Sequence, residues 1–178
     1  MCTASNSSSS NFLLTARNST NAQIAMGLFK ELRDSETIEK LRSIYNLNPE
    51  DFENLQDDKK KEIDYILDRL DTLGNLVTEG IIDKKLAIET YGGPPALRFW
   101  HKLKDYIRAK RDDRGYYGEN FEIFTRLSLD YFKEAGIKVK FYREGEEDKG
   151  IDLVTELQRD ELRPRSLKEI KRDRKKGK

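Results

Sequence analysis

Histidine and cysteine, the side chains most often used in catalytic and metal-binding sites, are almost missing from this sequence. The 178 residues include one histidine, His101, and one cysteine, Cys2. A single cysteine excludes an internal disulfide and is typical of a reducing compartment. A single histidine leaves no zinc-binding pattern and few ways to activate a serine or cysteine nucleophile. We therefore predict no catalytic, metal-binding or cofactor-binding residues, and a cytoplasmic location.

Long hydrophobic segments are missing as well. The longest apolar runs span two or three residues, as at residues 12–14, whereas a membrane-spanning helix needs about 20. The N-terminus does not combine a cationic start with the apolar region of a signal peptide. Because the net charge is +1, the chain as a whole has no electrostatic field that would attract nucleic acid or membranes.

Charged residues and helical periodicity are abundant. Charged side chains make up 38% of the chain, against roughly 25% in an average soluble domain, which favours helices with wide solvated faces. The clearest helix spans residues 57–80, where one apolar stripe is formed by Ile63, Ile66, Leu67, Leu70, Leu73, Leu76 and Val77. Gly74 falls on this stripe, so we expect another helix to cross closely there. Gly80 is placed to end the helix in the left-handed conformation.

The segment ETYGGPPALRFW (residues 89–100) predicts a hinge between helices. Its two glycines interrupt one helix, and its two prolines have a fixed φ that suits the first turn of the next. A phosphate-binding loop is disfavoured, because proline has no N–H group to offer an anion and no GK[ST] motif follows. Trp100 shares a face with the apolar residues of the following helix, so we expect it in the core.

These patterns together predict an all-α protein, with a compact bundle of about five or six helices over residues 19–136. Residues 1–18 are rich in Ser and Asn, and we expect them to be disordered. Residues 137–162 start with the alternating stretch IKVKFYRE, which predicts an extended arm with an unpaired edge and then a short helix. Residues 163–178 carry 9 basic and 2 acidic side chains, which indicates a disordered basic tail.

Two groups of polar residues can be interpreted either as a catalytic or metal-binding site or as residues with an ordinary structural role. Asp105 follows His101 by one helical turn and could orient it as a base, but a histidine at the boundary of the core is the favoured interpretation. Asp64, Asp68 and Asp71 share one helix face. A metal site would need facing Glu and His ligands from other helices, so a solvated face is the simpler interpretation.

A basic and aromatic turn between two of the predicted helices is the candidate recognition patch for a protein partner. Its residues are Arg108, Arg111, Arg114, Tyr116, Tyr117 and Asn120. Within this turn we expect Tyr117 to pack against the bundle and Tyr116 to be exposed.

The basic tail is a second candidate, for anions. Its residues are Arg163, Arg165, Lys171, Arg172, Arg174, Lys175 and Lys176. Clustered cations of this kind can bind nucleic acid or an anionic membrane surface.

The segments LGNLVTEGIID, PALRFWHKLKDYIRAKRDDRG and YYGENFE, in this order, carry a resemblance to a known family. Between residues 21 and 124 the chain resembles an uncharacterised prokaryotic family of all-helical domains of unknown function. The most specific matching positions are Gly80, Trp100, Arg111, Tyr117, Asn120 and Phe121. The resemblance implies a helical fold and no assigned activity. Many family members carry transmembrane helices ahead of the domain, so it also implies a membrane association, although this chain lacks such a helix.

We therefore predict a non-enzymatic protein-interaction or regulatory domain. Its partner is a protein that the sequence does not identify, and the unpaired edge of the arm is one place for it to dock. The alternative is weak binding of nucleic acid or of an anionic membrane surface through the basic tail.

Overall fold

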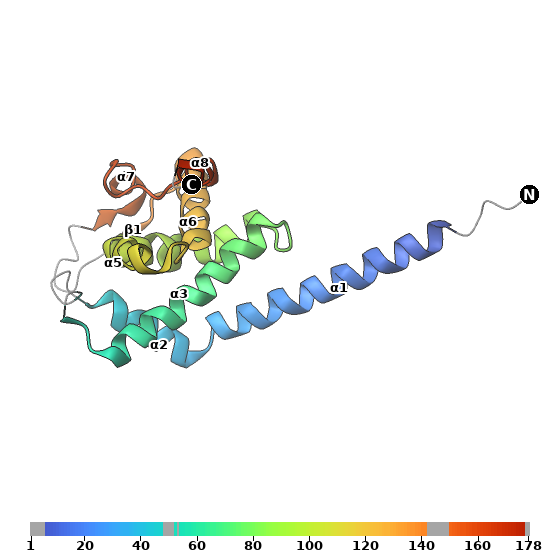
Figure 1. Cartoon of the computed structure of the whole chain (residues 1–178), viewed down its shortest axis with the longest axis horizontal. Helices are drawn as coiled ribbons and strands as arrows, with labels where there is room; N and C mark the ends of the chain where they lie inside the picture. Colours follow the sequence, from blue (N-terminus) through green and yellow to red (C-terminus); the bar gives the residue numbers. More distant parts are fainter. Residues whose placement is uncertain (1–5, 48–51, 53, 142–149, 177–178) are drawn as a thin grey trace, which may run out of the picture.

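The fold is given by a computed structural model that describes residues 6–47, 52, 54–141 and 150–176, with the backbone alone for residues 6–18 and Arg114. In chain order the elements are α1 (Asn6–Leu32), α2 (Ser35–Tyr45), α3 (Asp57–Thr78), α4 (Lys84–Ala87), η2 (Ile88–Arg98), α5 (Phe99–Arg114), α6 (Glu119–Glu134), β1 (Lys140–Phe141), β2 (Ile151–Asp152), α7 (Leu153–Glu156) and α8 (Leu167–Lys176). Helices dominate and form a compact body, from which α1 projects (Figure 1). The prediction of an all-α fold is confirmed.

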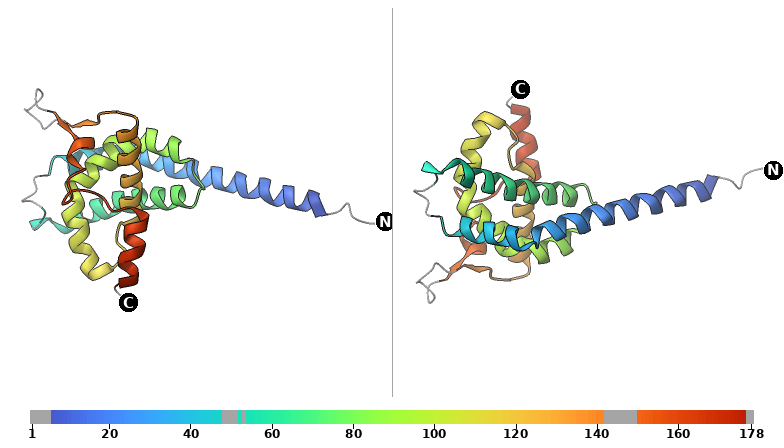
Figure 2. Two further views of the ribbon diagram at one scale, coloured as in Figure 1. Left: turned by 90° about the horizontal axis from the view of Figure 1, so that it is seen from above. Right: turned by 90° about the horizontal axis from the view of Figure 1, so that it is seen from below.

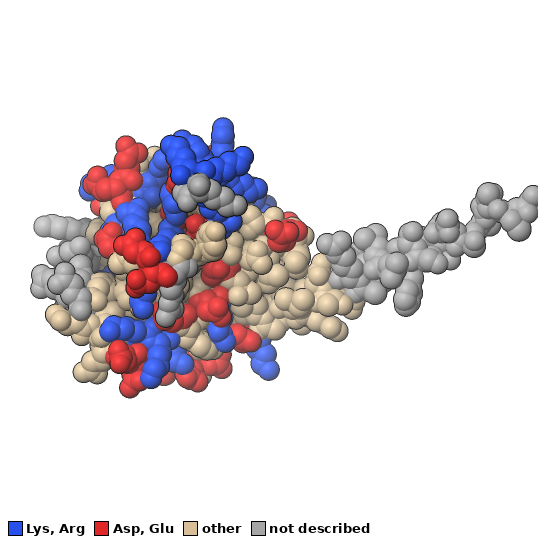
Figure 3. Space-filling model, in the orientation of Figure 1, with Lys and Arg blue, Asp and Glu red and all other residues tan. Residues whose placement is uncertain are grey.

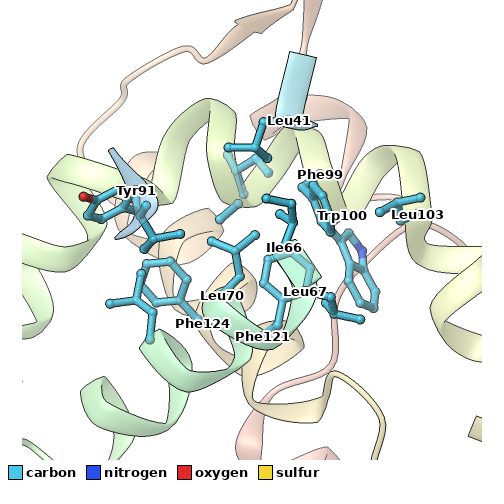
Figure 4. Close-up of a cluster of buried hydrophobic side chains, with 14 of the residues drawn as sticks. Leu41, Ile66, Leu67, Leu70, Tyr91, Phe99, Trp100, Leu103, Phe121 and Phe124 are labelled. Carbon is cyan, nitrogen blue, oxygen red and sulfur yellow. The ribbon is translucent and has the colours of Figure 1, made fainter. Parts of the chain in front are cut away.

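Helix α3 lies at the centre of the body and packs mainly against α6. Every residue of the predicted stripe is buried, and Ile63, Ile66 and Leu70 have no exposed surface at all. The side chains of α3 meet those of α5 and α6 in one cluster, which includes Phe99, Phe121 and Phe124 (Figure 4). The stripe forms because apolar residues at helical spacing remove one continuous surface from water when a second helix covers it.

The crossing of α3 and α6 is very close at Gly74, as expected. A Cβ atom on Gly74 would lie 2.1 Å from the backbone oxygen of Asn120, well inside van der Waals contact. Only glycine therefore lets the two backbones approach this far. Gly80, which follows the end of α3, has a φ of 69°, so its predicted left-handed conformation is also confirmed.

The glycine–proline segment forms a kink inside a helical path. Helix α4 continues into η2, a π-helical stretch that is broken at Gly93, where φ is −72° and ψ is −116°. The chain therefore changes direction without an intervening loop, and the hinge interpretation holds as a fixed kink. Gly92 serves packing, because a Cβ there would lie 2.7 Å from the Ser128 hydroxyl oxygen of α6.

Trp100 occupies the core, as expected. Its side chain is fully buried, and its ring lies 6.2 Å from that of Phe121. The indole N–H donates a hydrogen bond of 2.8 Å to the backbone oxygen of Leu162. Burial of this indole therefore stabilises the apolar cluster and also fixes the segment that leads into α8.

The N-terminal boundary of the helical part differs from the expected one. Helix α1 begins at Asn6, whereas the composition of residues 1–18 predicted disorder. Residues 6–26 contain no glycine or proline, so a helix that is anchored further along the chain can propagate through them at one hydrogen bond per residue. That anchor is the last turn of α1, where Leu28 and Leu32 are buried against the body.

The extended arm is paired within the chain, which corrects the expectation of an unpaired edge. Strand β1 pairs antiparallel with β2, with Phe141 opposite Ile151. Phe141 is buried, so its side chain draws the arm onto the body. Asp152 then caps α7 by accepting hydrogen bonds from the Val154 N–H and the Thr155 hydroxyl. Residues 142–149 of the expected arm lie outside the described residues.

The basic tail also differs from expectation, because residues 167–176 form α8. Helix α8 lies over the N-terminal half of α6 (Figure 2), and Ile170 is 1% exposed. Its start is a capping box: the Glu169 N–H donates to the Ser166 hydroxyl, and the Ser166 N–H donates to the Glu169 carboxylate. Local capping and a single buried isoleucine thus order a segment with no apolar stripe.

The close crossing at Gly74 generates the first prediction. Gly74→Ala should lower the free energy of unfolding by roughly 3 kcal/mol, because α3 and α6 must separate to admit the methyl group. Gly27→Ala is the matched control, since a Cβ there meets nothing within 4 Å, and it should stabilise α1 by up to about 1 kcal/mol. Urea unfolding of both variants measures the difference. Equal effects would show that the crossing is not under steric constraint.

Candidate interaction site at the turn between α5 and α6

The turn from α5 to α6 is built on two glycines in the left-handed region. Gly115 ends α5 with a φ of 61°, and Gly118 precedes α6 with a φ of 63°. Gly118 has no side chain to cap α6, so a residue of α3 does so. The Asp71 carboxylate accepts a 2.9 Å hydrogen bond from the Phe121 N–H and a 3.0 Å bond from the Asn120 side chain.

Burial raises the pKa of Asp71, although the hydrogen bonds from Phe121 and Asn120 act in the opposite direction. The carboxylate lies at the N-terminal end of α6, where the helix dipole favours negative charge. Asp71 therefore joins α3 to the first turn of α6 by an electrostatic contact as well as by hydrogen bonds.

Asp64 makes a second link from α3 to the turn. Its carboxylate accepts hydrogen bonds from the hydroxyl groups of Tyr117 and Tyr106. Asp64 and Asp71 are thus half-buried partners of the turn, which corrects the expectation of a solvated aspartate face; only Asp68 is exposed. Within the described part of the chain, no group of three or more His, Cys, Asp or Glu side chains could hold a metal ion.

Arg111 holds the α5–α6 turn together through contacts inside the protein. Its guanidinium donates to the backbone oxygens of Tyr117 at 2.8 Å and Gly118 at 3.2 Å, and to the Glu122 carboxylate at 2.7 Å. The planar guanidinium presents several N–H groups in a fixed geometry, so one side chain can hold the turn and a carboxylate together. The Arg111 side chain is 11% exposed, so it is directed at the turn and away from a partner.

Glu122 is a carboxylate with no exposed surface, and it lies between two arginines. It binds Arg111 of α5 on one side and, on the other, the Arg165 guanidinium at 3.0 Å and the Arg165 N–H at 2.8 Å. Burial lowers the pKa of Arg165, but the hydrogen bonds to Glu122 and Asp173 and the negative charges of these two groups together outweigh it and raise that pKa. Nearby, Glu119 pairs with Arg174 of α8. The carboxylates of α6 therefore determine where α8 docks.

The predicted recognition patch divides into an inner and an outer part. Arg111, Tyr117 and Asn120 are bound within the protein, and Arg108 donates to the Glu161 backbone oxygen at 2.9 Å. Tyr116 is the member that faces solvent, with 65% of its surface exposed. The expected packing of Tyr117 and exposure of Tyr116 are both observed. The side chain of Arg114 lies outside the described residues.

The predicted anion-binding residues divide in the same way. Arg163 pairs with Glu169 of α8, while Arg165 and Arg174 pair with Glu122 and Glu119 of α6. The guanidinium groups of these three arginines are thus held by carboxylates, although the Arg174 side chain is 47% exposed. The remaining four, Lys171, Arg172, Lys175 and Lys176, are exposed on α8. In Figure 3, Lys and Arg side chains gather at the upper end of the body, where Figure 1 draws α8.

Sequence reasoning missed Glu119 and Glu122, because acidic residues on a helix are usually solvated. One signal was present: the Ser166-x-x-Glu169 spacing after Pro164 is typical of a helix start and could have identified α8. His101 is half-buried on α5, in line with the boundary interpretation, and the carboxylate of Asp105 pairs with Lys104 at 2.8 Å.

Comparison with known proteins gives one match. A family model described as "Domain of unknown function (DUF4760)" matches residues 3–128. No match was found among curated proteins or among solved structures. Among the residues described, no helix has the length and apolar character needed to cross a membrane. The matched range contains α1 to α5 and the α5–α6 turn, and it ends within α6.

The contact between α6 and α8 generates a prediction about Arg165. Arg165→Met should lower the free energy of unfolding by about 3 kcal/mol, because it removes one of the two guanidinium partners of a buried carboxylate. Arg172→Met is the matched control, because the Arg172 side chain is 65% exposed and its ion pair with Asp173 is a long contact of 3.8 Å. It should change stability by less than about 0.5 kcal/mol. Thermal unfolding of both variants decides whether α8 is integral to the fold.

The capping box generates a prediction about acid. Hydrogen bonds from the Ser166 N–H and hydroxyl, together with the positive charges of Arg163 and Arg126, lower the pKa of Glu169 from 4.5 to about 2. A lowered folded-state pKa adds stability that is complete above pH 4.5 and is lost as the pH falls towards 2. The stability difference between wild type and Glu169→Gln should therefore shrink over this range in urea titrations. A difference that is constant with pH would contradict the role of Glu169.

Proposed function

We propose that this chain, which belongs to the family described as "Domain of unknown function (DUF4760)", is a non-enzymatic protein-interaction module that docks through α1. The observation that carries the proposal is the projection of α1 from the body, visible from two further directions in Figure 2. The last turn of α1 packs on the body through Leu28, Leu32 and the ring of Phe29, which lies 5.3 Å from that of Tyr91. The preceding turns extend beyond the body.

The charge distribution supports this proposal. Residues 1–29 contain one charged side chain, Arg17, in a chain that is 38% charged. Where α1 leaves the body, the surface in Figure 3 is mostly neither acidic nor basic. The part of α1 before its last turn therefore has few charges to desolvate, unlike the charged helix faces of the rest of the chain, so it is suited to burial against a partner.

Exposed apolar side chains on α1 give the second support. Met26 is 71% exposed and Ile24 is 46% exposed, whereas Leu28 and Leu32 face the body. A single helix that extends into water is marginally stable, because most helical stability in proteins comes from packing of one face. Ile24 and Met26 are two residues apart and therefore lie on different sides of α1. Burial of either side against another helix would stabilise the projecting part of α1.

We assign the partner helix to α1 of a second copy of the chain. The remaining surface of the body is rich in charge, and packing it on α1 would desolvate these charges without compensation. The part of α1 before its last turn has one charged side chain, Arg17, so it has little such cost against its own copy. Two copies can pair through the same surface about a two-fold axis. The interaction module is thus a self-associating one.

Self-association through α1 can be tested by analytical ultracentrifugation of the full chain. The wild type should form a dimer with increasing concentration. The double variant Ile24→Glu, Met26→Glu should stay monomeric, because it places a carboxylate on each side of α1, and whichever side faces the partner would bury one unpaired. Leu86→Glu is the matched control, since Leu86 is a 52% exposed leucine on α4, and it should dimerise like the wild type. A wild-type chain that is monomeric at the highest soluble concentration would overturn the proposal.

A further inference from the structure

Helix α8 has two faces of different chemistry. The face towards the body contains the buried Ile170, together with Glu169 and Asp173, which pair with Arg163 and Arg165 of the segment before α8. Arg174 lies at the edge of this face: its side chain is 47% exposed and pairs with Glu119 of α6. The opposite face consists of the exposed cations Lys168, Lys171, Arg172, Lys175 and Lys176. The basic character of this segment is therefore concentrated on its outer face, while the inner face holds α8 in place.

The outer cations are available and regularly spaced. Among the residues that the structure describes, Lys168, Lys171 and Lys175 form no ion pair with a carboxylate. Residues 168, 171 or 172, and 175 follow one another by three or four positions, so one cation recurs per helical turn of about 5.4 Å. The net charge of the chain is near zero because residues 163–178 are strongly basic and the remainder is acidic overall. The net charge alone therefore gives no sign of this basic surface.

An exposed aromatic ring lies next to this row of cations. Tyr116, in the α5–α6 turn, is 65% exposed, and the Arg174 guanidinium of α8 lies over its ring at 4.5 Å from the centroid. Figure 2 shows the C-terminal end of α8 beside the end of α5, in agreement with this contact. Tyr116 therefore adds an exposed aromatic ring at the edge of α8 where Arg174 lies.

We propose that the outer face of α8 and the ring of Tyr116 form a binding surface for single-stranded nucleic acid. The cations of α8 bind successive phosphate groups, and a base stacks on Tyr116. Rows of cations with an adjacent aromatic ring are how proteins bind single strands without sequence preference, because every base has a flat face. This surface is separate from the α1 surface proposed above.

An anionic membrane is the less suitable partner for the same cations. A helix that binds a membrane surface inserts apolar side chains between the lipid headgroups. On α8 the exposed apolar side chain is Leu167, 37% exposed at the first residue, while Ile170 is buried against the body. The ring of Tyr116, beside α8, is a further group that could insert between lipid headgroups. The surface therefore suits electrostatic contacts with phosphates and stacking of a base, and it offers few apolar side chains for insertion into a membrane.

The test uses the full chain and a fluorescently labelled oligothymidylate of about 20 nucleotides, longer than the roughly 4–16 nucleotides of typical single-strand sites. Fluorescence anisotropy should show binding at 50 mM salt that weakens steeply towards 200 mM. The double variant Lys171→Glu, Lys175→Glu should bind at least about tenfold more weakly, with a smaller salt dependence. Tyr116→Ala should lower the affinity about tenfold and leave the salt dependence unchanged, whereas Tyr116→Phe should bind like the wild type.

The matched control is Lys61→Glu, Lys84→Glu, which makes the same change in net charge on α3 and α4 and should bind like the wild type. Unchanged melting temperatures of all variants establish that the fold is kept, as expected for exposed side chains. Absence of binding at 50 mM salt, or equal loss in the control, would overturn the proposal. So would tighter binding to vesicles of phosphatidylserine and phosphatidylcholine than to the oligonucleotide.

Discussion

The approach of α3 and α6 at Gly74 is the constraint on which the other contacts of this protein depend. With the Gly74 Cα close to the backbone of Asn120, the carboxylate of Asp71 reaches the first turn of α6 and caps it. Two turns earlier on α3, Asp64 reaches the hydroxyl of Tyr117. A larger residue at position 74 would move α6 away from all of these groups at once. The crossing thus positions the α5–α6 turn and, with it, the buried face of α6.

Buried charge then connects the turn to α8. A carboxylate without exposed surface is costly unless its oxygens are saturated, and Glu122 is saturated by Arg111 and Arg165. Such ion pairs contribute little net stability compared with apolar packing, but loss of one partner is expensive. Their effect here is on position: Glu122 holds Arg165, just before α8, and Glu119 holds Arg174, near the end of α8. The two carboxylates thus orient α8 and leave its other face turned to solvent.

The sequence was sufficient for those features that are determined locally or by apolar periodicity. The stripe of α3, the close crossing at Gly74 and the burial of Trp100 all follow from residue types and their spacing, and the structure agrees with them. The roles of charged residues did not follow. The position of Asp71 or Glu122 along its helix does not distinguish it from an acidic residue that faces solvent. Their partners, Phe121 and Arg165, are brought to them by tertiary structure alone.

The segregation of charge explains how two proposed surfaces can coexist on a small body. Helix α1 projects to one side, while α8 lies at the upper end of the body (Figure 1). Pairing of two chains through α1 would therefore leave both copies of α8 open to solvent. Two linked basic surfaces would hold one strand with an affinity above that of each surface alone, because the second contact is intramolecular. In this arrangement α1 sets the number of binding surfaces, and α8 with Tyr116 sets their chemistry.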